Sequence, residues 1–349
     1  MNLMRLKSHL SRYLLIYVIV AMALGLALGY PNGKFIAQHK RLFTTLTTIT
    51  VFLIIYPMMV NLKLESLKLA AKNIKGLTIA LGYNFVYAPL FGYLLARVFL
   101  HDQLLALGFL LVMVVPCSSM SIGYTGLAEG NVELATVVMA VSFIFSIFAV
   151  PTWMSLFAAQ YHLPSPTWVL IKAMLTVLIA PMIAGYFTRV LLIKRLGEKR
   201  FMRLMPLFPS MSVLAMFAIV LLIFFMKAGL IIKKWDLVAW LAAPNTLFVG
   251  VTLLLITWAD RLIRLSYEDH MAIVFASTGK NNGTAIALAT MAFSPMVAIP
   301  AATLPIFQII LLVFYLKLAE RVRRYFLRRG PQPAPAGDPR KEEGKGSNV

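Results

Sequence analysis

The sequence contains few of the groups on which most enzymes depend. It has 13 acidic residues and a single cysteine among 349 residues. One cysteine cannot form an intramolecular disulfide. The sequence also lacks a phosphate-binding loop, a nucleophile elbow and any cluster of metal-ligating residues with the usual spacing. We therefore expect no enzymatic activity, no metal and no bound cofactor.

What the chain has in abundance is apolar residues, which make up 60% of the total. Runs of about 20 apolar residues match the thickness of a bilayer, so the sequence predicts an all-α membrane protein with ten transmembrane helices. We place these spans at 13–30, 43–62, 76–99, 104–128, 133–158, 168–190, 206–230, 237–257, 269–293 and 298–318. The first lacks a small-residue cleavage site and is interpreted as a retained span.

The net charge of +20 comes from Lys and Arg that concentrate in every second connecting segment and in the tail. This bias predicts a multi-pass cell-membrane protein with both termini in the cytoplasm, and it explains the charge better than nucleic-acid binding does. We expect a cytoplasmic tail at 1–12, a transmembrane domain at 13–320, and a basic, then disordered tail at 321–349. The sequence defines no oligomeric state.

Ten spans divide into two groups of five, at about 13–158 and 168–320. An odd number of spans per group forces the second group to enter the membrane from the opposite face, as in an inverted repeat. Asn84 precedes Ser119 by the same number of residues as Asn245 precedes Lys280. Each asparagine lies in the span before an interrupted one.

Two of the spans, 104–128 and 269–293, are interrupted. Prolines remove a backbone donor and glycines loosen the chain, so we assign the helix breaks to Pro116, Gly123, Gly279 and Gly283. Irregular backbone at membrane depth persists only inside protein or beside a cavity, and paired interruptions mark the binding site of many transporters. The candidate substrate-binding or coupling residues are Cys117, Ser118, Ser119, Ser121, Thr278, Lys280, Asn281, Asn282, Asn84 and Asn245.

Several short motifs resemble one known family. They are Tyr56-Pro57-Met58-Met59, the segment 84–89 (Asn-Phe-Val-Tyr-Ala-Pro), the segment 116–120 (Pro-Cys-Ser-Ser-Met), the segment 126–131 (Gly-Leu-Ala-Glu-Gly-Asn) and the pair Asn281-Asn282. Together they are similar to the arsenite-efflux permeases of the bile acid:sodium symporter superfamily, over about residues 13–320. The resemblance implies two inverted five-helix repeats, with helices 4 and 9 broken and crossing, and a panel domain that moves against a core domain.

The resemblance also implies roles for single residues. The cysteine that matches Cys117 is required in the efflux branch, which carries an acidic residue just after the Asn pair. Here that position is Gly283 or Thr284. The sodium-symporter branch has a glutamate at the position of Ser277, so the chain departs from both branches at the coupling residue. All 13 acidic residues and all five histidines fall in predicted loops, tails or span ends.

Lys280 lies in the second interruption and allows three interpretations. It could hold an anionic substrate, stand where a coupling cation would bind, or carry the transported proton. A fixed ammonium opposes a nearby cation, so sodium coupling is less expected than proton coupling. Hydrogen bonding to the carbonyl groups of a broken helix is the purely structural alternative.

Cys117 offers a soft ligand of the kind that trivalent arsenic prefers, although a buried cysteine often serves only as a small apolar residue. Asn84 and Asn245 either line the crossing or make hydrogen bonds between helices. We predict a secondary transporter that exports a small solute or oxyanion such as arsenite by alternating access. The alternatives are uptake of an organic anion that pairs with Lys280 and, more remotely, a membrane sensor that transports nothing.

Overall fold

The computed structural model describes residues 9–10, 13–61, 73–161, 167–233 and 235–327, and these residues are almost entirely helical, with no strand of a sheet among them. The elements in chain order are α2 (Leu14–Gly29), α3 (Gly33–Gln38), α4 (Lys40–Asn61), α5 (Ile74–Gly82), the π-helical turn η2 (Tyr83–Tyr87), α6 (Ala88–Phe99), α7 (Gln103–Val114), α8 (Met120–Leu127), α9 (Val132–Gln160), α10 (Thr167–Met174), the π-helical turn η3 (Leu175–Ile179), α11 (Ala180–Leu196), α12 (Glu198–Leu204), α13 (Leu207–Lys233), α14 (Trp235–Ala239), α15 (Ala242–Leu262), α16 (Tyr267–Thr278), α17 (Asn282–Ala292), α18 (Ile299–Lys317) and α19 (Ala319–Leu327).

The all-α prediction is confirmed, and each apolar stretch predicted to span the membrane is helical over most of its described residues. Six helical stretches are long and apolar enough to cross a bilayer: Lys40–Val60, Ile74–Phe99, Val132–Gln160, Glu198–Lys233, Ala242–Leu262 and Ile299–Lys317. Residues 104–128 and 269–293 each form two helices with a gap between them. The tail segments 1–8 and 328–349 lie outside the described residues, whereas 319–327 form helix α19.

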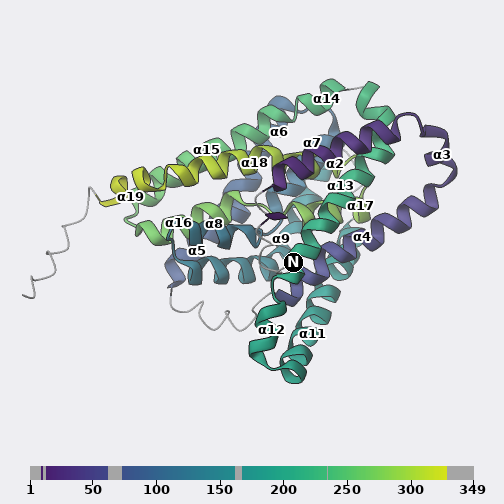
Figure 1. Ribbon diagram of the computed structural model, residues 1–349. Helices are drawn as coiled ribbons and strands as arrows, with labels where there is room; N and C mark the ends of the chain where they lie inside the picture. Colours follow the sequence, from purple (N-terminus) through teal and green to yellow (C-terminus); the bar gives the residue numbers. More distant parts are fainter. Residues whose placement is uncertain (1–8, 11–12, 62–72, 162–166, 234, 328–349) are drawn as a thin grey trace, which may run out of the picture.

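The helices form two groups (Figure 1). In the first, which we call the four-helix layer, α13 lies along α2 and α4, and α4 lies along α11. Close approach is possible because Gly25 and Gly29 of α2 face the backbone of α13, and Gly185 of α11 faces that of Met59. In a bilayer the hydrophobic effect contributes little to the association of apolar helices. Close van der Waals packing at small residues such as these glycines contributes instead.

The second group, which we call the inner bundle, contains α5 to α9 and α15 to α18, and the two broken helices lie within it. Its centre is α7, α16 and α17, whose residues are buried almost without exception. The four-helix layer contacts this bundle through α4 against α17 and α2 against α18.

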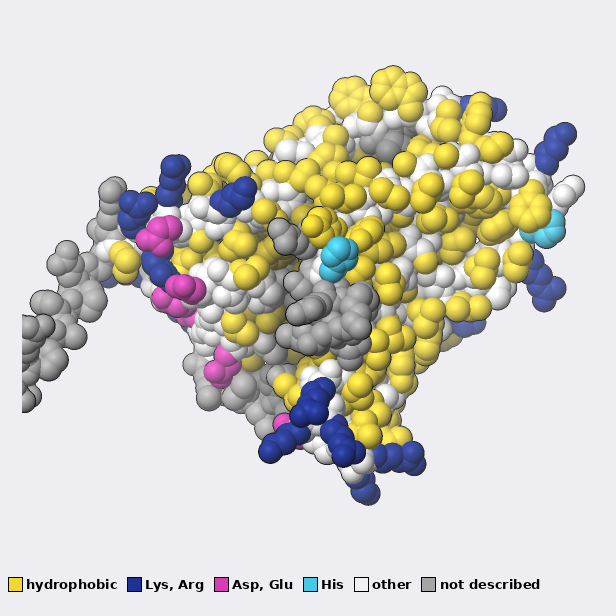
Figure 2. Space-filling view, viewed as in Figure 1, with side chains coloured by type: hydrophobic (Ala, Val, Ile, Leu, Met, Phe, Trp, Pro, Cys, Tyr) yellow, Lys and Arg dark blue, Asp and Glu magenta, His cyan; other side chains and the backbone are white. Residues whose placement is uncertain are grey.

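The surface of the molecule is apolar over a wide area (Figure 2). Lys and Arg gather at the ends of the view, where α12, α19 and the turn around α3 lie, and the region between them is mostly hydrophobic. Large apolar side chains such as Phe148, Phe187 and Leu254 are strongly exposed. An apolar surface of this extent is typical of a chain that lies in a bilayer.

Candidate transport site at the crossing of two broken helices

The two interruptions contact each other directly. The Ser118 amide donates to Gly279 O at 2.8 Å, and the Asn281 amide donates to Pro116 O at 3.0 Å. These bonds form an antiparallel bridge between Cys117 and Lys280. Since backbone groups at membrane depth need a partner within the protein, each interruption satisfies groups that the other leaves free.

Both interruptions are shorter than predicted. The first covers 115–119, so Gly123 lies inside α8; the second covers 279–281, so Gly283 lies inside α17. Side chains explain the early restart of each helix. Ser118 Oγ accepts from the Met120 amide at 3.2 Å, and Asn281 Oδ1 accepts from the Thr284 amide at 3.0 Å. The assignment of breaks to Gly123 and Gly283 was therefore wrong.

Gly279 lies in the second interruption, and its position requires the absence of a side chain. A Cβ there would collide with Ser121 Oγ and with Phe275 O. The Ser121 hydroxyl fills that space and donates to Gly279 O at 3.3 Å. The two chain segments consequently approach more closely than any other residue would allow.

Lys280 is fully buried, with 0% of its surface exposed. Its Nζ donates to both oxygens of Asn84, at 3.1 Å to Oδ1 and 3.3 Å to the backbone carbonyl. No ion pair with this ammonium occurs in the described part of the chain. A charge in such a place costs several kcal/mol in an apolar interior unless oxygen atoms solvate it. Asn84 supplies two of those oxygens.

Asn84 can do this because it lies in the π-helical turn η2. A π-helical turn widens the helix and changes which carbonyls bond within it, and such turns are frequent at functional sites. Two successive carbonyls of η2 bond to side chains: Asn84 O accepts from Lys280, and Phe85 O accepts from Trp153 Nε1 at 2.9 Å. The side-chain nitrogen of Asn84, Nδ2, donates to Ala80 O at 2.9 Å, and this bond holds Oδ1 toward Lys280.

Cys117 is also buried, and its thiol lies 3.4 Å from the Ser142 hydroxyl of α9. Ser142 donates its own proton to Met139 O at 2.9 Å. The thiol is therefore the donor in its contact with Ser142 and keeps its proton in this arrangement. Its neighbour across the bridge is Lys280.

The start of α17 contains polar atoms without a partner. Asn282 Nδ2 lies 3.4 Å from Gln308 Oε1 of α18, but Asn282 Oδ1 and Thr284 Oγ1 make no hydrogen bond to any described residue. The side chain of Asn281 reaches across to the four-helix layer, where Nδ2 contacts Met58 Sδ at 3.3 Å. Unpaired buried acceptors are costly, so these two are candidates for contact with a ligand.

The structure brings most of the predicted residues together, but not all of them. Ser118 and Ser119 are partly exposed beside the bridge, and Thr278 donates along its own helix to Val274 O at 2.6 Å. Asn245 is buried in α15, and neither atom of its side-chain amide has a partner among the described residues. It is thus unlike Asn84, its predicted counterpart in the other repeat.

Sequence reasoning missed Gln308 and Met58, and it placed Asp260 and His270 at span ends although both are fully buried. The sequence does contain a pattern that indicates the burial of Asp260. This residue follows Val249, Thr252 and Ile256 at helical spacing and so continues the buried face of α15. The bonds of this second polar cluster are described below.

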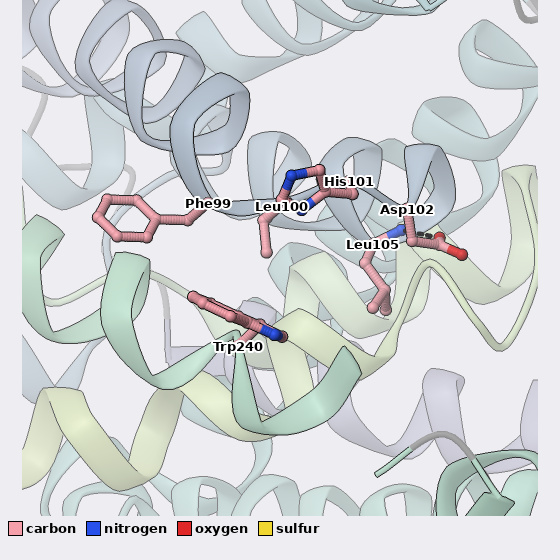
Figure 3. A pocket seen from close by; sticks show the side chains of 6 residues that line it. All are labelled: Phe99, Leu100, His101, Asp102, Leu105 and Trp240. Carbon is pink, nitrogen blue, oxygen red and sulfur yellow. Dashed lines mark hydrogen bonds between the residues drawn. The ribbon is translucent and has the colours of Figure 1, made fainter. Parts of the chain in front are cut away.

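A small pocket lies away from the crossing (Figure 3). It is lined by Phe99, Leu100, His101, Asp102, Leu105 and Trp240. The Asp102 carboxylate turns aside to cap α7, where it accepts from the Leu104 and Leu105 amides at 3.0 Å each. The Asp102 carboxylate therefore acts as the N-cap of α7, and the pocket contributes no residue to the crossing.

A helical bundle with an apolar surface and two broken helices that cross inside it defines a multi-pass membrane transporter. Residues 48–234 match the Sodium Bile acid symporter family, and the chain belongs to that family.

Among its relatives, the arsenical-resistance protein Acr3 of Corynebacterium glutamicum is 25% identical over 302 residues, which cover 82% of this chain and 81% of that protein. The uncharacterized sodium-dependent transporter YocS of Bacillus subtilis is 28% identical, with 86% and 89% covered. The uncharacterized transporter slr0944 of Synechocystis is 23% identical, with 95% and 93% covered.

Proposed function

We propose that this transporter exports a small, uncharged oxyacid of the arsenite type. It would act by alternating access in a ten-span fold of two inverted repeats, 13–158 and 168–320, with both termini in the cytoplasm. The observation that carries the proposal is the bonding of Lys280 Nζ to the two oxygens of Asn84. The arsenical-resistance relative supports the choice of solute.

Two oxygens that face a fully buried ammonium resemble the surroundings that a bound cation would have. Of the three interpretations of Lys280, this geometry favours the one in which the lysine replaces a coupling cation. A fixed positive charge in that place would oppose sodium by a few kcal/mol at intermediate effective dielectric. Transport is then independent of sodium and is driven by a proton gradient.

Because Lys280 donates to Asn84, the groups that remain to bind the solute are neutral. Arsenous acid is uncharged near neutral pH and has hydroxyl groups to donate. Asn282 Oδ1 and Thr284 Oγ1 are acceptors without a donor among the described residues, and Ser118 and Ser119 are partly exposed in the first interruption, which bonds to the second through the Ser118 amide. The Cys117 thiol is the soft ligand that trivalent arsenic prefers. One thiol binds arsenic weakly, which suits a solute that must be released.

Uptake of an organic anion is the rival function, and it requires a cation that faces the solute. Lys280 donates to Asn84 instead and has no exposed surface. Proteoliposomes that contain the purified protein distinguish the two. We expect arsenite and antimonite to be transported under a pH gradient, with or without sodium.

Transport of an organic anion under a sodium gradient, without arsenite transport, would replace the proposal with the rival. No transport of either solute, with protein that binds arsenite, would favour a sensor. For Lys280→Met, which removes the buried ammonium, the matched control is Lys199→Met, because Lys199 is exposed on α12 and far from the crossing in the chain.

The proposed orientation has its own test. Cys117 is the only cysteine, so Cys117→Ser gives a background free of thiols. Into it we would introduce Lys34→Cys, expected outside, or Lys199→Cys, expected in the cytoplasm; both positions are exposed. An impermeant maleimide applied to intact cells should label the first variant alone. Labelling of the second variant alone would show that the topology is the inverse of the one proposed.

A further inference from the structure

A second polar cluster lies where α15 ends and α16 begins. His270 Nδ1 is 2.8 Å from Asp260 Oδ2, and His270 Nε2 is 2.8 Å from the Tyr315 hydroxyl of α18. Tyr315 OH lies 2.6 Å from Thr257 Oγ1, and Tyr83 of η2 donates to Asp260 Oδ1 at 3.0 Å. Asp260 and His270 are both fully buried.

The directions of these bonds determine how many protons the cluster holds. Thr257 donates its hydroxyl proton to Leu253 O at 2.6 Å, so it can only accept from Tyr315. Tyr315 then has no proton left for His270, and Nε2 must donate to it. The bond between Nδ1 and Asp260 Oδ2 needs one further proton, and Asp260 Oδ1 already accepts from Tyr83. All the bonds are made together only if His270 and Asp260 hold two protons between them, and with an ionised carboxylate both protons lie on the ring nitrogens.

A second arrangement exists with one proton fewer. His270 passes its Nε2 proton to Tyr315, Tyr315 passes its own to Thr257, and Thr257 releases to water the proton that it had donated to Leu253 O. Each hydroxyl then donates in the opposite direction, and His270 is neutral. The cluster changes from an imidazolium–carboxylate pair of zero net charge to a single negative charge. Thr257, the last residue of this hydrogen-bonded series, is partly exposed.

The groups around the cluster have partners of their own. The Phe326 ring of α19 covers the imidazole, with centroids 4.6 Å apart and planes 21° apart. The charged residues on neighbouring elements contact other partners: Arg323 of α19 pairs with Glu129 at 2.6 Å, Arg261 lies over the Tyr325 ring, Lys75 of α5 donates to Ile263 O, and Asp269 accepts from Asn73 and Asn131.

The cluster is connected to the crossing by two routes. Helix α16 carries His270 in its first turn and ends at Thr278, directly before the second interruption. Tyr83, which bonds to Asp260, precedes Asn84, which holds Lys280. A change in the charge of Asp260 and His270 therefore acts on both elements that position the buried ammonium.

We propose that His270 and Asp260 form a binding site for a single proton and that this proton is the one coupled to export. The inference rests on the proposed function for its role in transport, but the site itself is defined by the bonds of the cluster. Tyr315 and Thr257 pass the proton to and from the imidazole, and Asp260 compensates its charge. No step of this proton transfer involves Lys280.

One test needs no solute. In protein labelled with ¹⁵N-histidine, the ring nitrogens report whether an imidazole is neutral or charged, and His270→Gln identifies the resonances. We expect both ring nitrogens of His270 to carry a proton in the wild-type protein, and Tyr315→Phe to remove the one on Nε2. An imidazole that is neutral in the wild-type protein under the conditions of transport would contradict the site.

A second test uses transport. With one proton per solute, a pH gradient of one unit supports about a tenfold solute gradient. His270→Gln should lose this accumulation but keep the exchange of labelled for unlabelled arsenite without a gradient, which also shows that the variant is folded. Tyr315→Phe should reduce accumulation in the same way. The matched control is His39→Gln, at an exposed histidine directly after α3.

If His270→Gln still accumulates arsenite about tenfold, the proton binds elsewhere and the proposal fails. Failure of the wild-type protein to transport arsenite at all would instead overturn the proposed function, and the histidine resonances would still decide on the proton site.

Discussion

The two interruptions differ in a way that separates their roles. In the first, Ser118 and Ser119 keep part of their surface exposed, and the polar groups are neutral. In the second, 279–281 are buried, and the charge of Lys280 is bound to Asn84. A surface that must admit and release a solute needs exposed groups, whereas a charge that replaces a coupling ion needs a closed site. Under the proposed function, the exposed serines of the first interruption would contact the entering solute, whereas Lys280 in the second would replace the coupling ion.

The largest test of this comparison uses the two asparagines. Asn84→Leu removes an oxygen from a buried ammonium, and leaving a buried charge without its partner typically costs about 3–5 kcal/mol. Asn245→Leu removes an amide that has no hydrogen-bond partner among the described residues, so it should be neutral or stabilising by about 1 kcal/mol. Thermal unfolding in detergent, followed by tryptophan fluorescence, measures both. Equal losses would show that Asn84 and Asn245 have equivalent roles.

Next in size is Lys280→Met, which leaves the oxygens of Asn84 without their donor. Unpaired buried acceptors cost about 1–3 kcal/mol, and where this cost falls on the transport cycle it lowers arsenite transport without sodium by about 5- to 150-fold. If the ammonium replaces a cation, added sodium should restore part of the rate in this variant and in no other. A variant that transports normally without sodium would assign Lys280 a structural role only.

A smaller effect distinguishes the two glycines that were both predicted to break helices. Gly279→Ala forces a collision with Ser121 and the Phe275 carbonyl, which we expect to destabilise the protein by about 1–3 kcal/mol. At Gly123 a Cβ meets no described atom within 4 Å, so Gly123→Ala should leave the unfolding temperature unchanged or raise it. A loss of stability at Gly123 would mean that the exposed face of α8 is in contact with another part of the protein.

The smallest expected change in stability is that of Cys117→Ser. A serine can still donate to Ser142, so unfolding should shift by less than about 1 kcal/mol. Transport of arsenite should fall by about tenfold, however, because a hydroxyl is a hard ligand and trivalent arsenic prefers sulfur. Ser142→Ala is the matched control, since it removes the hydrogen bond and keeps the thiol. Unchanged transport in Cys117→Ser would remove the thiol from the mechanism.

Much of the fold could be predicted because the bilayer imposes one length on every span. Two of the residues between α7 and α8 and between α16 and α17 were also visible in the sequence, since Pro116 lacks a backbone donor and Gly279 lacks a side chain. The ends of the interruptions were not, because they depend on caps such as that of Asn281 on Thr284. A capping side chain and a solvating one look the same in a sequence.

The partners across the fold were the least predictable part. Asn84 bonds to Lys280 over 196 positions, and nothing in the sequence orients Oδ1 toward the ammonium. His270 was predicted near a span end, and its position is indeed at the start of α16. Its burial follows from Tyr315 and Phe326, which come later in the chain and pack against it. Such groupings arise from tertiary packing rather than from local periodicity.

The bridge between the interruptions also has a consequence for the order of synthesis. Ser121 and Gly279 are 158 positions apart, so the first interruption emerges from the ribosome long before the second. At about 5–20 residues per second, it waits roughly 8–30 s for the backbone groups that complete it. Through that interval the unpaired Ser118 amide and Pro116 carbonyl depend on water or on the insertion machinery. The crossing therefore assembles late in the synthesis and folding of the protein.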